Sequence, residues 1–184
     1  YGFTANPSQY FTPTTPTAPS SYDLSFNKKN FKSPQVWKTT MAIDQKLPFG
    51  FTGTVEGILQ KNINAISYYN ANFDGPVGTF TGTDNRPRYA RADNGVRVND
   101  NVSNGIVLTN TDEGYFYSTT VKLEYPYQRG LWGSLAYTHS NATDLMSPGS
   151  VASGSWTGAR SVNGNNDLEV SNSNNNTPNR IVGV

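Results

Sequence analysis

The segment Val36–Gln60, with the sequence VWKTTMAIDQKLPFGFTGTVEGILQ, decides the fold. Apolar and polar side chains alternate in it on both sides of a short Pro48-Phe49-Gly50 step. A period of two indicates β-strands whose two faces meet different surroundings, and Pro and Gly at the step are typical of a tight turn. The segment therefore predicts a β-hairpin with one apolar face. Alternation alone does not say whether that face contacts a protein core or a lipid bilayer.

The same pattern returns twice further along the chain. EGYFYSTTVKLEYPY and LWGSLAYTHSNATDL both alternate with period two, and the short PYQRG step joins them. No segment carries a 3.6-residue apolar stripe of useful helical length. The predicted organisation is therefore an irregular segment over 1–30, a hairpin over 35–69, a long loop over 70–112, a second hairpin over 113–145, another long loop over 146–179, and a strand start at 180–184.

The connections between these strands alternate between short and long. Tight turns on one side and extended loops on the other are typical of outer-membrane β-barrels, whereas loops of mixed length at both ends are typical of a soluble β-sandwich. The strands are also long enough, since a tilted strand crosses a bilayer in about 9–11 residues. The predicted fold class is all-β: an antiparallel transmembrane β-barrel fragment of about four strands and a fifth strand start, with short periplasmic turns and long extracellular loops.

Composition limits the other classes. The 184 residues are 35% hydrophobic and 15% charged, with net charge +1 and no Cys. Scattered single Lys and Arg residues argue against a nucleic-acid partner, which requires clustered basic residues. The absence of Cys excludes disulfides and thiolate metal sites. There is no apolar run of transmembrane-helix length and no signal-peptide pattern, so Tyr1 is expected to be an internal or processed end.

Charge phasing assigns the two faces of the predicted strands. A Lys or Arg facing lipid at the bilayer midplane costs about 2–4 kcal/mol, so the charged phase is expected to face the lumen. The predicted lumen-facing residues are Lys38, Asp44, Glu56, Lys122 and Glu124. The residues predicted to face lipid or its interface are Trp37, Met41, Ile43, Val55, Leu59, Tyr117, Val121, Leu123 and Leu135. Aromatic residues near the strand ends suit the girdles found at membrane interfaces.

Three segments resemble the barrel of TonB-dependent outer-membrane receptors of the Oar-like branch, which is distantly SusC-like. The segment NFKSPQVWKTTMAIDQKLPFGFTGTVEGILQKNINAISYYNANF resembles one hairpin of these barrels. NTDEGYFYSTTVKLEYPYQRGLWGSLAYTHSNATDL is similar to another, and TPNRIVGV is similar to the strand entry after it. The resemblance covers about residues 31–72, 110–146 and 177–184, and its motifs are structural, not catalytic.

The resemblance implies a receptor in the bacterial outer membrane that captures a substrate with extracellular loops and imports it through a plugged barrel. The implied partners are outer-membrane lipid and lipopolysaccharide, the protein's own plug domain, TonB and a surface lipoprotein. The chain has no plug and no TonB-contacting box, and about four strands cannot close a barrel, whose smallest bacterial form has about eight. We therefore expect it to be part of a longer protein.

The loop DNRPRYARADNGVRVNDN carries the candidate ligand contacts. Arginine binds anions bidentately, and tyrosine stacks on sugars and cations, so this composition suits an anionic or glycan ligand. A solvated loop with internal salt bridges is the alternative interpretation. The candidate residues are Arg86, Arg88, Tyr89, Arg91 and Arg97.

Other polar groups point to no chemistry. His139 has no second His or Cys as a metal-ligating partner, and Asp112-Glu113 reads as a solvated loop edge. The clusters at Asp93-Asn94-Gly95 and at 163–167 lack EF-hand spacing and are typical of turns. We expect no enzyme activity, cofactor or metal. Two alternatives remain open: a secreted or surface β-sandwich for glycan binding or adhesion, and a structural barrel subunit of an outer-membrane complex.

Overall fold

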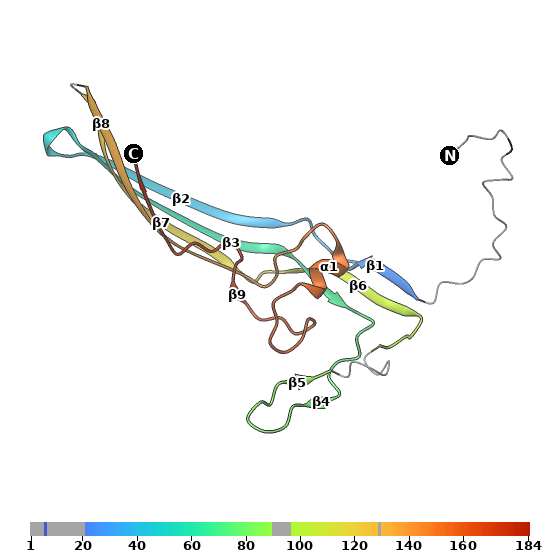
Figure 1. Cartoon of the computed structure of the whole chain (residues 1–184). Coiled ribbons are helices and arrows are strands. Elements are labelled where there is room, and N and C mark those ends of the chain that lie inside the picture. Colours follow the sequence, from blue (N-terminus) through green and yellow to red (C-terminus); the bar gives the residue numbers. More distant parts are fainter. Residues whose placement is uncertain (1–5, 7–20, 90–96, 129) are drawn as a thin grey trace.

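The computed structural model describes residues 6, 21–89, 97–128 and 130–184, and it is mostly β-strand, as predicted (Figure 1). The elements in chain order are β1 Tyr22–Asn27, β2 Gln35–Lys46, a 3-10 turn Pro48–Gly50, β3 Thr52–Asn70, β4 Gly78–Thr79, β5 Pro87–Arg88, β6 Val102–Thr111, β7 Tyr115–Gln128, β8 Leu131–Asp144, α1 Ala152–Thr157, β9 Ser171–Asn172 and β10 Asn179–Gly183.

Five strands form a long curved antiparallel ribbon in the order β2-β3-β7-β8-β10 (Figure 1). Strand β6 pairs with the far part of β3, and β1 pairs with β6 in the parallel sense. In the described part of the chain β2 pairs only with β3, while β10 pairs only with β8. The sheet is therefore not closed.

Short and long connections lie at opposite ends of the ribbon. The β2–β3 turn is built by Phe49 and Gly50, whose φ angles of 66° and 85° are positive. This turn and the one that joins β7 to β8 occupy the same end, which we call the turn end (Figure 1). The β4–β5 pair and α1 lie at the opposite end, called the loop end (Figure 1). The short connections of the predicted alternation thus lie at the turn end, and the long ones lie at the loop end.

Three predicted boundaries need correction. The loop predicted over 70–112 contains β6, whose sequence VSNGIVLTNT alternates poorly and so gave little strand signal. The irregular segment predicted over 1–30 contains β1, although Tyr22, Leu24 and Phe26 do alternate there. The loop predicted over 146–179 contains α1 and β9. The six-residue helix is too short to show an apolar stripe.

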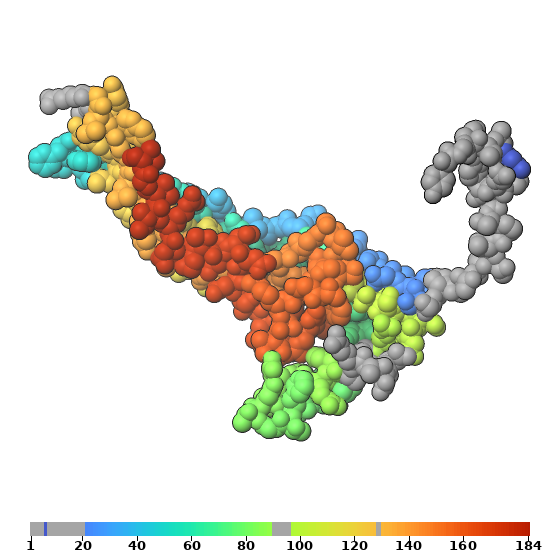
Figure 2. All heavy atoms as spheres, in the orientation of Figure 1, coloured from blue at the N-terminus to red at the C-terminus, as the bar shows by residue number. Residues whose placement is uncertain are grey.

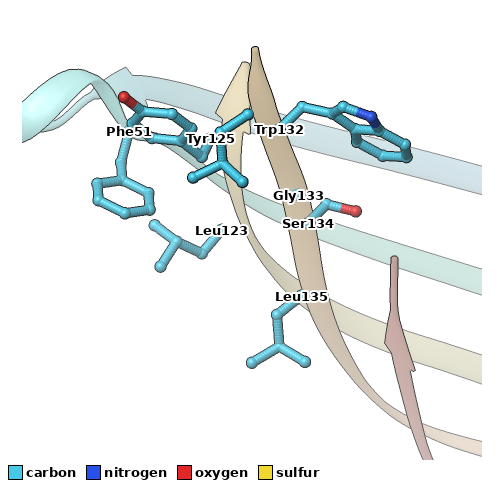
Figure 3. A pocket seen from close by; sticks show the side chains of 8 residues that line it. Phe51, Leu123, Tyr125, Trp132, Gly133, Ser134 and Leu135 are labelled. Atoms are coloured by element: carbon cyan, nitrogen blue, oxygen red, sulfur yellow. The ribbon is translucent and has the colours of Figure 1, made fainter. Parts of the chain in front are cut away.

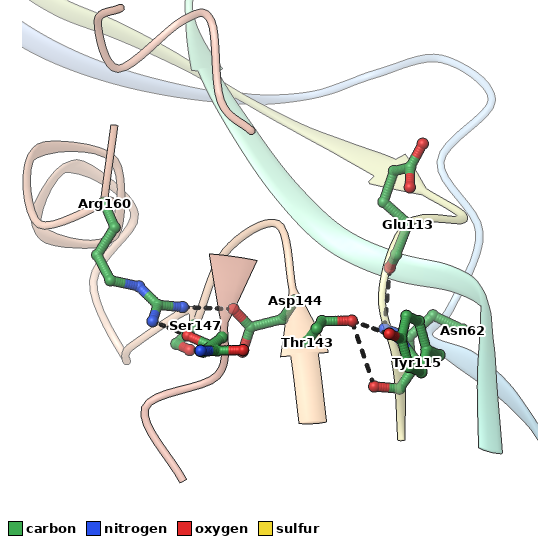
Figure 4. Close-up of polar contacts among 8 residues, drawn as sticks. Asn62, Glu113, Tyr115, Thr143, Asp144, Ser147 and Arg160 are labelled. Carbon is green, nitrogen blue, oxygen red and sulfur yellow. Dashed lines mark hydrogen bonds and ion pairs between the residues drawn. The ribbon is translucent and has the colours of Figure 1, made fainter. Parts of the chain in front are cut away.

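Strands β6 and β7 pair with β3 in one continuous register. Ala65 faces Thr111, and Lys61, four residues earlier, faces Tyr115, four residues later. At the joint Gly114 adopts φ +94°, which favours glycine. The Asn62 side chain donates to the carbonyl of Glu113 at 3.0 Å and holds this joint closed (Figure 4). The register with β3 therefore continues from β7 into β6, and β7 itself begins at Tyr115, close to the predicted hairpin start at 113.

The buried core lies at the loop end. Among the described residues, the buried hydrophobic side chains are Ile106, Val107, Met146 and Trp156. The segment around α1 lies against this end of the sheet, beside the β4–β5 pair (Figure 2). None of these four buried side chains comes from the five-strand ribbon. The hydrophobic side chains described on the ribbon are therefore at least partly exposed.

Replacing Gly114 by alanine tests the joint. A Cβ there would lie 2.7 Å from the Thr143 carbonyl oxygen and 2.8 Å from Asn62 Nδ2, in addition to the positive φ. We expect the Gly114→Ala variant to lose about 1–3 kcal/mol in free energy of unfolding, measured by urea denaturation. Gly57→Ala is the matched control, because a Cβ there meets nothing within 4 Å. Equal stability of the two variants would contradict the proposed joint.

Candidate functional site: two faces and a loop end

One face of the ribbon carries a continuous row of apolar side chains. The register aligns Ile43 with Val55, Val55 with Val121, Val121 with Tyr137, and Tyr137 with Ile181. This row crosses all five strands, and its members are 44–73% exposed. Because residues directly opposite in a sheet project to the same side, the row defines a face, which we call the apolar face.

The predicted lipid-facing residues all lie on this apolar face. They alternate with the residues of the opposite face along each strand, and the register brings them together across strands. The members are Trp37, Met41, Ile43, Val55, Leu59, Tyr117, Val121, Leu123 and Leu135. Their common placement follows from the structure, whereas contact with lipid remains a prediction.

The opposite face, called the charged face, carries the predicted lumen-facing residues. These residues are Lys38, Asp44, Glu56, Lys122 and Glu124. Lys122 forms an ion pair with Glu124 at 2.5 Å, and Asp44 accepts a hydrogen bond from the Thr54 hydroxyl. The sequence reading missed Arg180, which joins this face opposite Thr138.

Aromatic side chains mark both limits of the apolar face. At the turn end, Phe51 and Tyr125 meet edge to face with ring centroids 5.1 Å apart. They border a shallow apolar hollow with Leu123 and Leu135, while Trp132 projects to the other side of the strand (Figure 3). Toward the loop end, the stacked rings of Tyr115 and Tyr117 have centroids 6.3 Å apart.

The candidate arginines that the structure describes have different partners. Arg86 is held by Asp84 through two hydrogen bonds of 2.9 and 2.8 Å. Arg88 lies in β5 opposite Gly78. The backbone of Arg97 forms an isolated antiparallel β-bridge with that of Phe73. Arg91 and the Asp93-Asn94-Gly95 cluster lie outside the described residues. Internal pairing, the alternative reading of this loop, therefore applies to Arg86.

The Asp84–Arg86 pair shifts both ionisation equilibria. Hydrogen bonds from the Arg86 side chain and backbone N–H lower the pKa of the Asp84 carboxyl from 3.8 to about 2. The same pairing raises the pKa of the Arg86 guanidinium. An arginine bound in this way has fewer donors left for a ligand. Arg88 and Arg97 are exposed and remain the better ligand candidates in the described part of this loop.

Tyr89 has a structural role at the loop end. Its hydroxyl donates to the carbonyl of Asn163 at 2.8 Å, and its ring lies 4.9 Å from that of Phe73. Phe73 in turn meets Trp156 edge to face at 5.7 Å. These contacts tie the segment before residue 90 to the segment after α1. The Tyr89 ring thus already has aromatic and polar partners within the fold.

Asn166 connects the same segment to the end of β3. The Asn70 backbone N–H donates to Asn166 Oδ1 at 2.8 Å, and Asn166 Nδ2 donates back to the Asn70 carbonyl at 2.9 Å. Trp156 Nε1 also donates to Asn166 Oδ1, at 2.8 Å. The Asn166 amide therefore bonds both the N–H and the carbonyl of the residue at the end of β3, as the backbone of a neighbouring strand would. No local sequence pattern indicates this contact, because its partners are 96 residues apart.

The remaining polar candidates have ordinary partners. His139 Nδ1 lies 3.2 Å from Asn179 Oδ1, and Glu113 N–H donates to the Thr111 hydroxyl. Asp144 binds Arg160 at 2.6 Å and accepts from Ser147, close to the Thr143–Tyr115 contacts (Figure 4). In the part of the chain that the structure describes, no three His, Cys, Asp or Glu side chains gather where a metal ion could bind.

Comparisons with known proteins add no further identification. No family model, no curated protein and no solved structure matches this chain. Among the described residues, no helix has the length and apolar character needed to cross a membrane.

Asn166→Asp tests the loop-end connection. The carboxylate still accepts from Asn70 N–H and Trp156 Nε1, but it cannot donate to the Asn70 carbonyl. We expect the free energy that protects the Asn70 amide from hydrogen exchange to fall by about 1–3 kcal/mol. Asn174→Ala is the control, because Asn174 is exposed and its side chain forms no hydrogen bond with the described residues. Unchanged protection in Asn166→Asp would rule out the connection.

The pH dependence of the Asp84–Arg86 pair gives a second test. The folded-state pKa of Asp84 is lower than its ordinary value, so the pair stabilises the β4–β5 segment above pH 3.8 and is lost as the pH falls through about 2. We expect Arg86→Gln to return the Asp84 pKa toward 3.8, measured from the carboxyl carbon shift by NMR. Arg88→Gln should leave it unchanged. A shift of similar size in both variants would contradict the specific pairing.

Proposed function

We propose that this chain forms part of the wall of a TonB-dependent receptor barrel in the bacterial outer membrane. The apolar face would contact lipid, and the charged face would line the lumen and meet the plug domain. The exposed row from Ile43 to Ile181 carries the proposal, because soluble monomers rarely leave an apolar patch larger than about 300–600 Å² uncovered. The bilayer is the surrounding that makes such a face favourable.

The height of the apolar face supports this environment. Tyr115 and Tyr125 lie on the same face of β7 and mark its two aromatic limits. Ten residues of strand rise about 33 Å, and a tilt of about 40° reduces this to about 25 Å along the membrane normal. That value equals the apolar band of about 25 Å in outer-membrane barrels. The strand length between the girdles therefore suits a bilayer.

The loop-side limit of the apolar face lies at one level on β2, β3 and β7 and at another on β8. On β2 the loop-side limit is Trp37, which lies in the row of Lys61 and Tyr115. On β8 the limit is Tyr137, which faces Val121, because His139 and Asn141 are polar. The limit therefore lies in one row on β2, β3 and β7, and on β8 it lies six residues nearer the turn end.

The proposed receptor would capture its substrate at the loop end. The loop end carries the β4–β5 pair and the α1 segment, and these would face the cell exterior. Arg88 and Arg97 would contact an anionic or glycan ligand, together with Arg91 from the same loop. No bond chemistry is required, because import uses binding energy followed by an externally driven conformational change. The expected partners are outer-membrane lipid, lipopolysaccharide, the plug domain, TonB and a surface lipoprotein.

A lysine scan across one strand tests the proposal. Val121 lies near the middle of the apolar face, and Thr120, its neighbour in sequence, lies on the charged face. We expect Val121→Lys to weaken folding of the full-length protein into phosphatidylcholine vesicles by about 2–4 kcal/mol, measured by urea titration of the vesicle-bound protein. Thr120→Lys should change this free energy little.

The outcomes also separate the alternatives. A β-sandwich for glycan binding or adhesion would cover the apolar face with a second sheet, so the protein would be soluble without detergent. Solubility of that kind, or equal effects of the two lysine variants, would overturn the barrel proposal. A structural barrel subunit would pass the vesicle test but would lack substrate import in an uptake assay.

A further inference from the structure

Lys61 is the exception to the separation of charge between the two faces. In β2, β7, β8, β10 and the part of β3 that pairs with β7, the other charged side chains lie on the charged face. Lys61 lies on the apolar face, opposite Trp37 on one side and Tyr115 on the other. Within the described residues it forms no ion pair. An uncompensated cation thus lies at the loop-side limit of an apolar surface.

The surroundings of Lys61 form a small amphipathic hollow. Its lining includes the rings of Trp37, Tyr115 and Tyr117 and the side chain of Leu59. Trp37, Leu59, Lys61 and Tyr115 are all exposed, so a ligand has access to the ammonium group and to the apolar floor together. Leu59 leads toward Val55 along the same face of β3. Lys61 therefore lies at one end of an apolar track along β3.

We propose that this hollow binds an anionic phospholipid, with the phosphate on Lys61 and an acyl chain along Leu59 and Val55. The inference rests on the proposed orientation of the apolar face toward the membrane. A lysine near an anionic lipid surface contributes about 1 kcal/mol, and Trp and Tyr rings lie at the headgroup level in membranes. The loop-side limit of the apolar face passes through Trp37 and Tyr115, and Lys61 pairs with both, so Lys61 lies at that level.

The geometry favours a lipid over a free anion or a protein segment. A free phosphate would use the ammonium group and leave the aromatic and leucine walls exposed to water. An acidic peptide would pair with Lys61 but would place its backbone over an apolar track that offers no hydrogen bonds. A lipid satisfies both parts, because its headgroup is anionic and its chains are apolar.

Lipid titration by native mass spectrometry tests the site. The protein in neutral detergent is titrated with phosphatidylglycerol and, separately, with phosphatidylcholine. We expect Lys61→Gln to weaken the first phosphatidylglycerol binding step about fivefold and to leave phosphatidylcholine binding unchanged. Lys61→Arg should retain the preference. Lys38→Gln is the matched control, because Lys38 lies in the next position of the same β2–β3 pairing but on the charged face.

Each outcome has a separate meaning. Equal phosphatidylglycerol affinity in wild type and Lys61→Gln, or an equal loss in Lys38→Gln, would overturn the lipid site. Displacement of the lipid by an equal concentration of inorganic phosphate would show an anion site without lipid recognition and would also overturn it. Flotation of the full-length protein with vesicles is measured in parallel. Flotation without headgroup preference refutes the lipid site alone, whereas failure to float refutes both the site and the barrel proposal.

Discussion

The cross-strand register is the constraint on which the rest of the molecule depends. Side chains alternate with a period of two, so a slip of one residue in any pair would move that strand's apolar set to the charged face. The row from Ile43 to Ile181 exists only because four successive pairings keep the same phase. Turn geometry at Pro48–Gly50 fixes the first pairing, and the Gly114 joint keeps β6 and β7 in one register with β3. Because the register is fixed in this way, the charged side chains of neighbouring strands gather on the charged face.

Asparagine side chains provide a second kind of pairing where regular strands stop. Asn166 binds both the N–H and the carbonyl of Asn70, and Asn110 binds both groups of Lys32 in the same way. An amide side chain carries the same donor and acceptor as a peptide, so it can satisfy backbone groups that would otherwise be left without partners. This use explains why polar, Asn-rich segments form ordered contacts at the loop end. Low hydrophobic content is compatible with order there because hydrogen bonds supplement a small core.

The predictability of the fold follows from the range of each interaction. The hairpin strands could be predicted because alternation is a local signal, and the structure places β2 and β3 within a residue or so of the predicted limits. The faces could be predicted because charge follows the same period. Strand β6 could not, since its Asn and Gly residues hide the alternation and its order comes from β3. The Tyr89 and Asn166 contacts could not be predicted either, because they join segments far apart in sequence. Tyr89, which the composition of its loop suggested as a ligand contact, instead contacts another segment of the fold.

The two open edges of the ribbon set a condition on any membrane environment. Within the described residues, the outer edges of β2 and β10 carry backbone groups with no neighbouring strand. In hydrocarbon each unsatisfied peptide group costs several kcal/mol, so lipid-exposed sheet edges do not occur in bilayers. A wall with this apolar face must therefore be continued by further strands on both sides. The exposed face and the open edges thus lead to the same conclusion: lipid contact requires closure, and under the barrel proposal other strands of the same protein provide it.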